Sequence, residues 1–258
     1  LSQLNNKVGF IADMEKKMSG LDHLVDDDSC DSQSNEDEKF QPFIHQMIVK
    51  QYLNSFSPYR GLLLYHGLGS GKTCSSIGVI ESMKHNKEKI FIMTPASLQK
   101  NYKTQMKLCG NQLFQENNYW EFVEFPKDNT KESFLQEIRV LTQLPLKYLR
   151  RKNGVYLVNK TKEGQSNFHS NFSEKEKDAI REQIDLMIDN KFNYINYNGI
   201  SREKWNLQYT DNGQRNPFNN STIVIDEGHN FVSRIVNKLN AKQTSVSTDI
   251  YEDIMKAE

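Results

Sequence analysis

The sequence predicts an α/β fold in which a mostly parallel sheet is sandwiched by helices. Three short apolar runs support this prediction, and they cover residues 62–65, 89–95 and 221–225. Each run is followed by residues typical of a turn and then by a pattern typical of a helix. Strands that alternate with helices in this way indicate a parallel sheet that is buried on both faces.

The first run, Leu62 to Tyr65, leads into a glycine-rich turn and then into a predicted helix over residues 74–83. The turn has the sequence His66-Gly67-Leu68-Gly69-Ser70-Gly71-Lys72-Thr73. A strand, a glycine turn and a helix, in that order, form the context that a phosphate-binding loop requires. Glycine tolerates the backbone angles that let successive N–H groups converge, and the helix adds its positive N-terminal end.

The side chains after the glycines fit the same chemistry. Lys72 would reach the outer phosphates of a nucleoside triphosphate, and the hydroxyl of Thr73 would ligate Mg²⁺. His66 departs from the usual pattern, which has glycine or alanine at that place. The alternative is a chance glycine-lysine turn, and the flanking strand and helix argue against it.

The third run, residues 221–225, ends in two adjacent carboxylates, Asp226 and Glu227. A buried parallel strand would deliver them to the C-terminal edge of the sheet. Beside a phosphate-binding loop, Asp226 would hold Mg²⁺, and Glu227 would orient and deprotonate the attacking water. His229 would sense the γ-phosphate or couple to a neighbouring element. Alone, such a pair is more typical of a solvated turn; together with Lys72 it favours a shared metal site.

The middle run, residues 89–95, predicts a further parallel strand, followed by a helix over 96–107. Thr94 and Pro95 would then lie at the sheet edge where ligands bind, although a plain strand-to-helix turn is the alternative. Upstream, Pro42 opens a helix that runs towards residue 56. Within this helix, Gln46 is on its own evidence a surface glutamine.

Residues 110–220 contain weaker signals. They predict strands over 119–125, 155–158 and 192–197, and helices over 131–144 and 173–190. The second helix begins with a capping box of Ser173 and Glu176. The basic cluster of residues 147–152 could touch phosphates, but a solvated face of an insert is favoured. A helix over 230–239 follows the acidic pair.

The chain of 258 residues has a formal net charge of zero, which hides an asymmetry. Residues 22–38 hold eight acids and no lysine or arginine, so the remainder has 33 basic and 25 acidic side chains. A moderately basic body favours nucleic acid, and an ordinary solvated surface explains it equally well. We expect an N-terminal helix and acidic flexible linker over 1–39. A folded domain over 40–240 follows, with an insert at about 110–190. We expect a polar tail over 241–258 that ends at a truncation point.

No apolar run approaches the roughly 20 residues of a membrane span, and no signal peptide is visible. Three scattered cysteines, Cys30, Cys74 and Cys109, favour a reduced intracellular setting over a disulfide framework. We therefore expect an intracellular protein with no membrane partner.

Taken together, these segments resemble the first RecA-like domain of superfamily 2 DExH helicases and ATPases. The matching residues follow the family's order, and they are Gln46, the loop from His66 to Thr73, Thr94-Pro95 and Asp226-Glu227-Gly228-His229. More narrowly, residues 59–73, 192–199 and 216–218 are similar to helicase-like proteins of nucleocytoplasmic large DNA viruses, a group that includes early transcription factor ATPases.

The resemblance implies a RecA-like P-loop NTPase fold, with ATP and Mg²⁺ as cofactors. Gln46 would pair with adenine, residues 66–73 would hold the phosphates, and Lys72, Glu227 and His229 would serve catalysis. DNA or RNA would bind through its backbone near Thr94 and Pro95. Further expected partners are a second RecA-like domain of the same parent protein and a viral RNA polymerase, in the virion or the host cytoplasm.

The family completes its site with arginines from the second domain, so the isolated chain is expected to bind ATP with weak turnover. The alternatives are a transcription-factor or structural subunit that uses ATP as a switch, and an unrelated P-loop ATPase with no role for Gln46.

Overall fold

The computed structural model describes residues 42–54, 57, 59–67, 69–83, 89–128, 130–241 and 245–258, together with Ala12, Lys16 and Ser19. The expected N-terminal helix and acidic linker, apart from those three residues, lie outside the described residues, as does Leu68. The chain divides into two compact units. Unit 1 comprises residues 1–86, 105–121 and 156–178, and unit 2 comprises residues 87–104, 122–155 and 179–258.

Unit 1 is built around two helices, α2 (Ile44–Tyr52) and α3 (Lys72–Ser82), which pack against each other. The hydroxyl of Ser82 donates to the carbonyl of Leu53 at 3.1 Å and links the ends of the two helices. Ile77 and Ile80 on α3 are fully buried. The helix predicted over 74–83 is therefore confirmed, and it begins two residues earlier, directly after Gly71.

The strand expected at residues 62–65 is not formed, and that prediction was wrong. Residues 61–67 have no regular secondary structure, and Leu63 and Tyr65 are 85% and 94% exposed. An apolar run becomes a strand only where a neighbouring chain accepts its backbone hydrogen bonds. None of the described strands pairs with this segment. The run therefore reaches the loop as an irregular segment with mostly exposed side chains.

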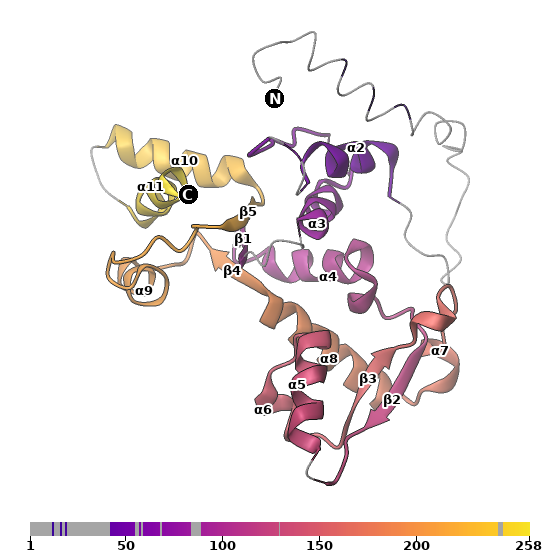
Figure 1. Ribbon diagram of the computed structural model, residues 1–258. Helices are drawn as coiled ribbons and strands as arrows, with labels where there is room; N and C mark the ends of the chain where they lie inside the picture. Colours follow the sequence, from indigo (N-terminus) through magenta and orange to yellow (C-terminus); the bar gives the residue numbers. More distant parts are fainter. Residues whose placement is uncertain are drawn as a thin grey trace. The chain divides into compact units, whose positions relative to one another are not determined.

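The sheet of unit 2 has three parallel strands in the order β4-β1-β5 (Figure 1). The strands are β4 (Phe192–Asn196), β1 (Lys89–Thr94) and β5 (Ser221–Ile225). The register pairs Thr94 with Asn196 and Met93 with Ile225, so all three strands end together. The α/β prediction with a parallel sheet flanked by helices is confirmed.

The core of unit 2 lies between this sheet and the helices that follow its strands. It is formed mainly by large apolar side chains of β1, β4, α9 (Arg202–Trp205), α10 (Gly228–Asn240) and α11 (Val246–Lys256), and of the segments after β4 and before β5. These residues are Phe91, Met93, Ile195, Tyr197, Trp205, Phe218, Phe231, Ile235 and Ile250. Ile250 is fully buried, so the segment expected as a polar tail contributes a helix to the core.

The remaining elements are α4 (Gln99–Cys109), η3 (Gln112–Phe114), β2 (Trp120–Glu124), α5 (Lys131–Thr142), α6 (Leu146–Leu149), β3 (Gly154–Val158), η4 (Lys160–Lys162), α7 (Phe168–Asn171), α8 (Glu174–Lys191) and the π-helix η5 (Asn206–Thr210). Among them, α4, β2, α5, β3 and α8 correspond to predicted helices and strands, and the short helices were not predicted. Strands β2 and β3 form a separate two-stranded sheet. The predicted capping box begins α8, where the Glu176 carboxylate accepts from the backbone N–H of Ser173 at 2.8 Å.

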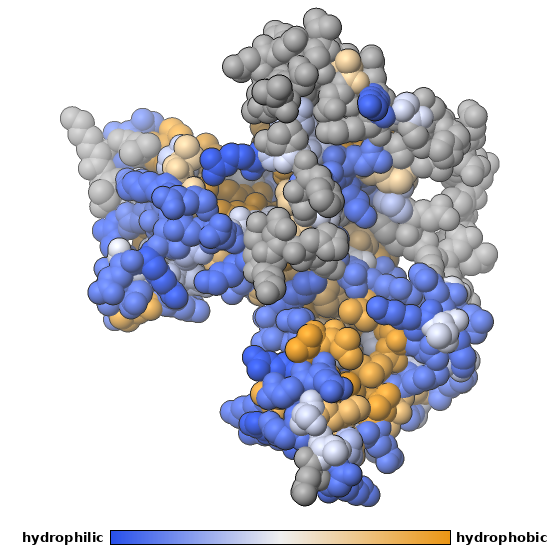
Figure 2. Space-filling view, viewed as in Figure 1, coloured by the Kyte–Doolittle hydropathy of each residue, from blue (hydrophilic) through white to orange (hydrophobic). Residues whose placement is uncertain are grey.

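Hydrophilic side chains cover most of the described surface that faces the viewer in Figure 2. Apolar side chains gather in the region of α5, where Val140 and Leu141 are exposed. No helix among the described residues is long and apolar enough to span a membrane.

Cys74 and Cys109 form a disulfide, which corrects the expectation of scattered reduced cysteines. The two residues are 35 positions apart in sequence, and their Cα atoms are 5.7 Å apart. Spacing along the chain could not reveal the pair, because the packing of α3 near the end of α4 brings the residues together. The bridge attaches the first turn of α3 to the segment that ends α4.

We expect Cys109→Ser to lower the free energy of unfolding of unit 1 by about 2–4 kcal/mol, because a cross-link that closes a loop of this length restricts the unfolded chain. Urea denaturation of the oxidised chain and the variant would measure this difference. A reducing agent should bring the parent chain to the variant's stability and leave the variant unchanged. Equal stability of the oxidised parent and the variant would contradict the prediction.

Candidate functional site

The glycine loop (residues 66–73) turns through two left-handed residues before α3 begins. Gly69 has φ +79° and Gly71 has φ +71°, a region that only glycine adopts readily. Gly71 is the N-cap, and the first intrahelical bond runs from the Ser75 N–H to its carbonyl at 3.0 Å. The N–H groups that precede this bond are therefore available at the helix N-terminus, as anion binding requires.

The ammonium group of Lys72 lies over the loop. Its Nζ donates to the carbonyls of His66 and Gly67 at 3.2 and 3.0 Å. The hydroxyl of Ser70 also donates to the carbonyl of Gly67, at 2.9 Å. The ammonium group is thus held by two carbonyls of the loop that leads into α3. This combination of an ammonium group and a helix N-terminus is suited to a polyphosphate.

Helix α2 supports the loop through Gln46. This side chain is 4% exposed, so its interpretation as a surface glutamine was wrong. Its Nε2 donates to the carbonyl of Gly71 at 3.3 Å, while its Oε1 accepts from the Phe43 N–H at 3.0 Å. Both ends of the amide therefore bond to backbone, and adenine recognition by Gln46 stays a prediction.

His45 is a loop contact that sequence reasoning missed. Its Nε2 lies 2.7 Å from the carbonyl of Ser70, and because a carbonyl only accepts, this nitrogen donates. The ring packs edge-on against His66, with centroids 5.4 Å apart. The Nδ1 atom of His66 is buried without a hydrogen-bond partner among the described residues. The one available signal was the position of His45 beside Gln46.

In unit 2 the acidic turn (Asp226 and Glu227) follows β5 directly. The N–H of Asp226 donates to the carbonyl of Met93 at 2.9 Å and extends the ladder between β5 and β1 by one residue. Glu227 then adopts φ +51°, and α10 begins at Gly228. Both acids therefore lie at the C-terminal edge of the parallel sheet, as the sequence predicts.

The carboxylate of Glu227 lies 3.3 Å from Nδ1 of His229. His229 is exposed on the first turn of α10, so it is a surface neighbour of the carboxylate. The residues expected to serve catalysis in this segment are therefore in mutual contact. Their roles stay predictions.

Thr94 and Pro95 do not lie on the surface. Thr94 is 0% exposed, and Pro95 is also buried, so neither side chain of the expected strand contact is accessible. The Oγ1 of Thr94 has no hydrogen-bond partner among the described residues. The exposed part of this turn begins at Ala96, whose N–H donates to Oδ1 of Asn198 at 3.0 Å.

The basic cluster of residues 147–152 has acidic neighbours. Arg150 pairs with Glu132 at 2.6 Å, which lowers the pKa of the Glu132 carboxyl, and Lys152 pairs with Glu182 at 3.4 Å. These pairs are solvent-exposed. They favour the interpretation of a solvated face over a phosphate contact.

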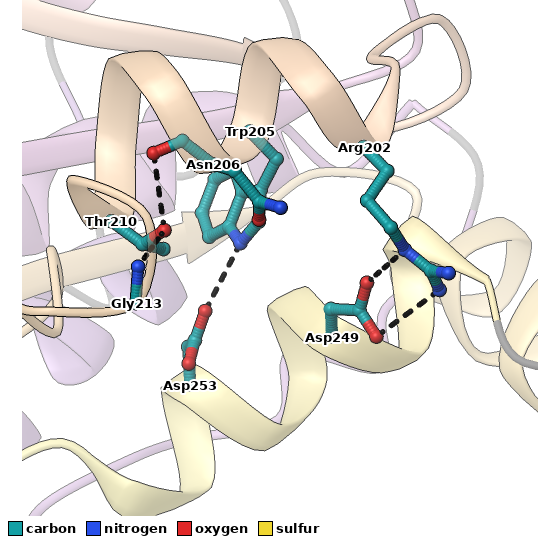
Figure 3. A pocket seen from close by; sticks show the side chains of 7 residues that line it. All are labelled: Arg202, Trp205, Asn206, Thr210, Gly213, Asp249 and Asp253. Carbon is teal, nitrogen blue, oxygen red and sulfur yellow. Dashed lines mark hydrogen bonds and ion pairs between the residues drawn. The ribbon is translucent and has the colours of Figure 1, made fainter.

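A shallow pocket of about 340 Å³ in unit 2 lies where α11 meets α9 and η5 (Figure 3). Its polar groups bond to one another. Arg202 donates to Asp249 at 2.8 Å, and the indole Nε1 of Trp205 donates to Asp253 at 3.0 Å. These bonds therefore hold α11 against α9, and they leave the polar groups of the pocket already paired.

Comparison with known proteins gives partial matches to viral helicases. Over 74 residues the chain is 43% identical to "Putative ATP-dependent RNA helicase R563" of Acanthamoeba polyphaga mimivirus. This match covers 28% of this chain and 13% of the relative. It is 38% identical over 85 residues to "Putative ATP-dependent RNA helicase R350" of the same virus, covering 32% of this chain and 10% of the relative. It is 48% identical over 42 residues to "Putative helicase 009L" of Frog virus 3, covering 16% and 4%.

The matched segments thus span between 4% and 13% of the length of these relatives. No family model matches the chain, and no solved structure does. The parallel sheet flanked by helices is compatible with a RecA-like fold. The matches are partial similarities to proteins named as ATP-dependent RNA helicases.

Alanine substitutions should rank the three glycines of the loop by their backbone geometry. A Cβ at Gly67 would meet open space, so Gly67→Ala should change the free energy of unfolding by less than about 0.5 kcal/mol. Gly69→Ala should cost about 1–2 kcal/mol through its left-handed backbone alone. Gly71→Ala should cost more, because its Cβ would also overlap the Gln46 amide. Equal losses in chemical denaturation would contradict this order.

The Asp253 carboxyl should make stability depend on pH. Burial raises its pKa above the usual value, although the Trp205 bond and Lys256 oppose the rise. A raised folded-state pKa means that stability is present at low pH and is lost as the carboxyl ionises. Asp253→Asn keeps an acceptor for Trp205, so its melting temperature should exceed the parent's at pH 7, with the gap closing below about pH 4. Asp249→Asn, which removes the partner of Arg202, should show no such gain.

Proposed function

We propose that the chain is the ATP-binding motor part of a nucleic-acid-dependent DExH helicase or ATPase of viral type, linked to transcription. The observation that supports this most is the glycine loop of unit 1, in which two left-handed glycines, a helix N-terminus and an ammonium group lie together. That set of groups matches the requirements of a triphosphate. The partial similarity to viral helicases supports the same reaction class.

Nucleotide would bind with its outer phosphates at Lys72. The ammonium group would exchange its two carbonyl contacts for phosphate oxygens, which carry full negative charge and form stronger hydrogen bonds. Gln46 and His45 would hold the loop in shape from α2. Both contacts reach loop carbonyls, so they leave the loop N–H groups for the ligand.

Mg²⁺ is the metal that this donor chemistry fits. The described residues contain no group of three or more His, Cys, Asp or Glu side chains placed to hold an ion. Mg²⁺ in nucleotide sites is typically held by one or two protein oxygens together with phosphates and water. Thr73 and Asp226 would supply those protein oxygens. The ion would neutralise charge on the phosphates during transfer.

Glu227 would orient and deprotonate the attacking water, and His229 would couple the carboxylate to bound nucleotide. Nucleic acid would contact the exposed residues that follow Pro95, through its backbone and in a salt-dependent manner. A second RecA-like domain would supply the transition-state arginines, so we expect this chain to bind ATP with weak turnover. A viral RNA polymerase is a proposed partner of the whole protein.

Lys72→Ala should weaken binding of a non-hydrolysable ATP analogue with Mg²⁺ about 10- to 100-fold, because a charged hydrogen-bond donor to phosphate is lost. Isothermal titration calorimetry of the 258-residue chain would measure this change. Lys160→Ala, an exposed lysine of unit 1 outside the loop, is the matched control and should bind as the parent does.

Asp226→Asn should weaken binding of the ATP analogue in Mg²⁺ but have little effect on binding in EDTA.

Unchanged ATP binding in Lys72→Ala would refute the proposal. Tight nucleic-acid binding by the whole protein with no turnover would favour the switch subunit, and equal affinity for ATP and GTP would favour an unrelated P-loop ATPase.

A further inference from the structure

The turn after β4 contains a tyrosine that reaches the acidic turn. In the sheet order β4-β1-β5, Tyr197 follows the strand on the far side of β1 from β5. Its hydroxyl nevertheless lies 3.2 Å from the carbonyl of Asp226 and 3.2 Å from the carbonyl of Glu227. The side chain thus reaches the acidic turn from the far side of β1, and its single hydroxyl hydrogen is shared between the carbonyls of Asp226 and Glu227.

The tyrosine is fixed by the core. Tyr197 is 2% exposed, and its ring packs against Phe231 of α10 with centroids 5.3 Å apart. Both partners of the Tyr197 hydroxyl are carbonyl oxygens, which only accept, so the hydroxyl is the donor. The hydroxyl therefore holds the turn as a donor from a rigid position.

The acidic turn needs such support because its backbone is strained. Glu227 has φ +51°, and a left-handed conformation costs a residue with a side chain roughly 1–2 kcal/mol. Strained residues of this kind persist where surrounding contacts determine them, and they are common at functional sites. The two carbonyls that Tyr197 binds are those of the strained residue and of the residue before it.

Asn198, the residue after Tyr197, makes a corresponding contact with the turn that follows β1. Oδ1 of Asn198 accepts from the Ala96 N–H at 3.0 Å, in the turn that follows β1. Two successive residues after β4 therefore fix the two turns that follow β5 and β1. The end of β4 organises this edge of the sheet.

We propose that Tyr197 is a positioning residue: its hydroxyl holds the backbone of Asp226 and Glu227 in the conformation that presents the Glu227 carboxylate for water activation. This inference rests on the proposed function for the role of Glu227, but its geometric part does not. It predicts that the hydroxyl matters for turnover and for the rigidity of the turn, while the ring matters for packing.

Tyr197→Phe separates the hydroxyl from the ring. The matched control is Tyr194→Phe on β4, because the Tyr194 hydroxyl is buried without a hydrogen-bond partner among the described residues. Both variants remove one buried hydroxyl from the same segment, and both keep the aromatic ring. A difference between them therefore reports the bonds to the acidic turn.

Hydrogen–deuterium exchange tests the geometric part without any activity. In Tyr197→Phe the amides of Asp226 and Asn230, which donate to the carbonyls of Met93 and Glu227, should exchange about 5- to 30-fold faster, as expected for the loss of a buried hydrogen bond. Tyr194→Phe should leave them unchanged. Unchanged exchange in Tyr197→Phe, with the variant folded, would overturn the inference.

Single-turnover ATP cleavage with the chain in excess tests the functional part. Tyr197→Phe should lower the cleavage rate on the order of 10-fold, since a small misplacement of a catalytic group has effects of this size. Its affinity for the ATP analogue should stay within about twofold of the parent's, which a general structural defect would not spare. Faster exchange with an unchanged cleavage rate would overturn the positioning role. Absence of ATP binding in the parent chain would instead refute the proposed function, leaving exchange to decide the geometry.

Discussion

The parallel register of three strands is the constraint on which unit 2 depends. Because β1 pairs with β4 on one side and β5 on the other, and because all three strands end together, the residues that follow them meet at one edge. The turns after β5, β1 and β4 are brought together in this way, and hydrogen bonds connect them. They contain Asp226, Ala96, and Tyr197 with Asn198, respectively. The chemistry proposed for the acidic turn follows from this alignment rather than from any one residue.

Unit 1 achieves local order by different means. Its glycine loop is shaped by two left-handed glycines, by the start of α3 and by backbone contacts from His45 and Gln46 on α2. The Cys74–Cys109 bridge then attaches the first turn of α3 to the end of α4. Short-range geometry therefore forms the loop, and side chains from α2 and α4 restrain it.

Sequence patterns predicted the features that depend on neighbours in the chain. The helix after the glycine loop, the capping box of α8 and the acids after β5 were all correct, because a few adjacent residues determine each of them. The strand at residues 62–65 was wrong, since strand formation needs a partner that apolar composition does not supply. Thr94 was placed on the correct edge, but its burial depends on elements that pack over it.

Local chemistry alone thus determined the glycine turn, the helix that follows it, and the two carboxylates at a strand end, because backbone preferences and side-chain periodicity act over a few residues. Packing between distant segments decided the burial of Gln46, the pairing of Cys74 with Cys109, and the reach of Tyr197 to the acidic turn. These contacts join residues from about 25 to 35 positions apart, and no periodicity in the chain encodes them.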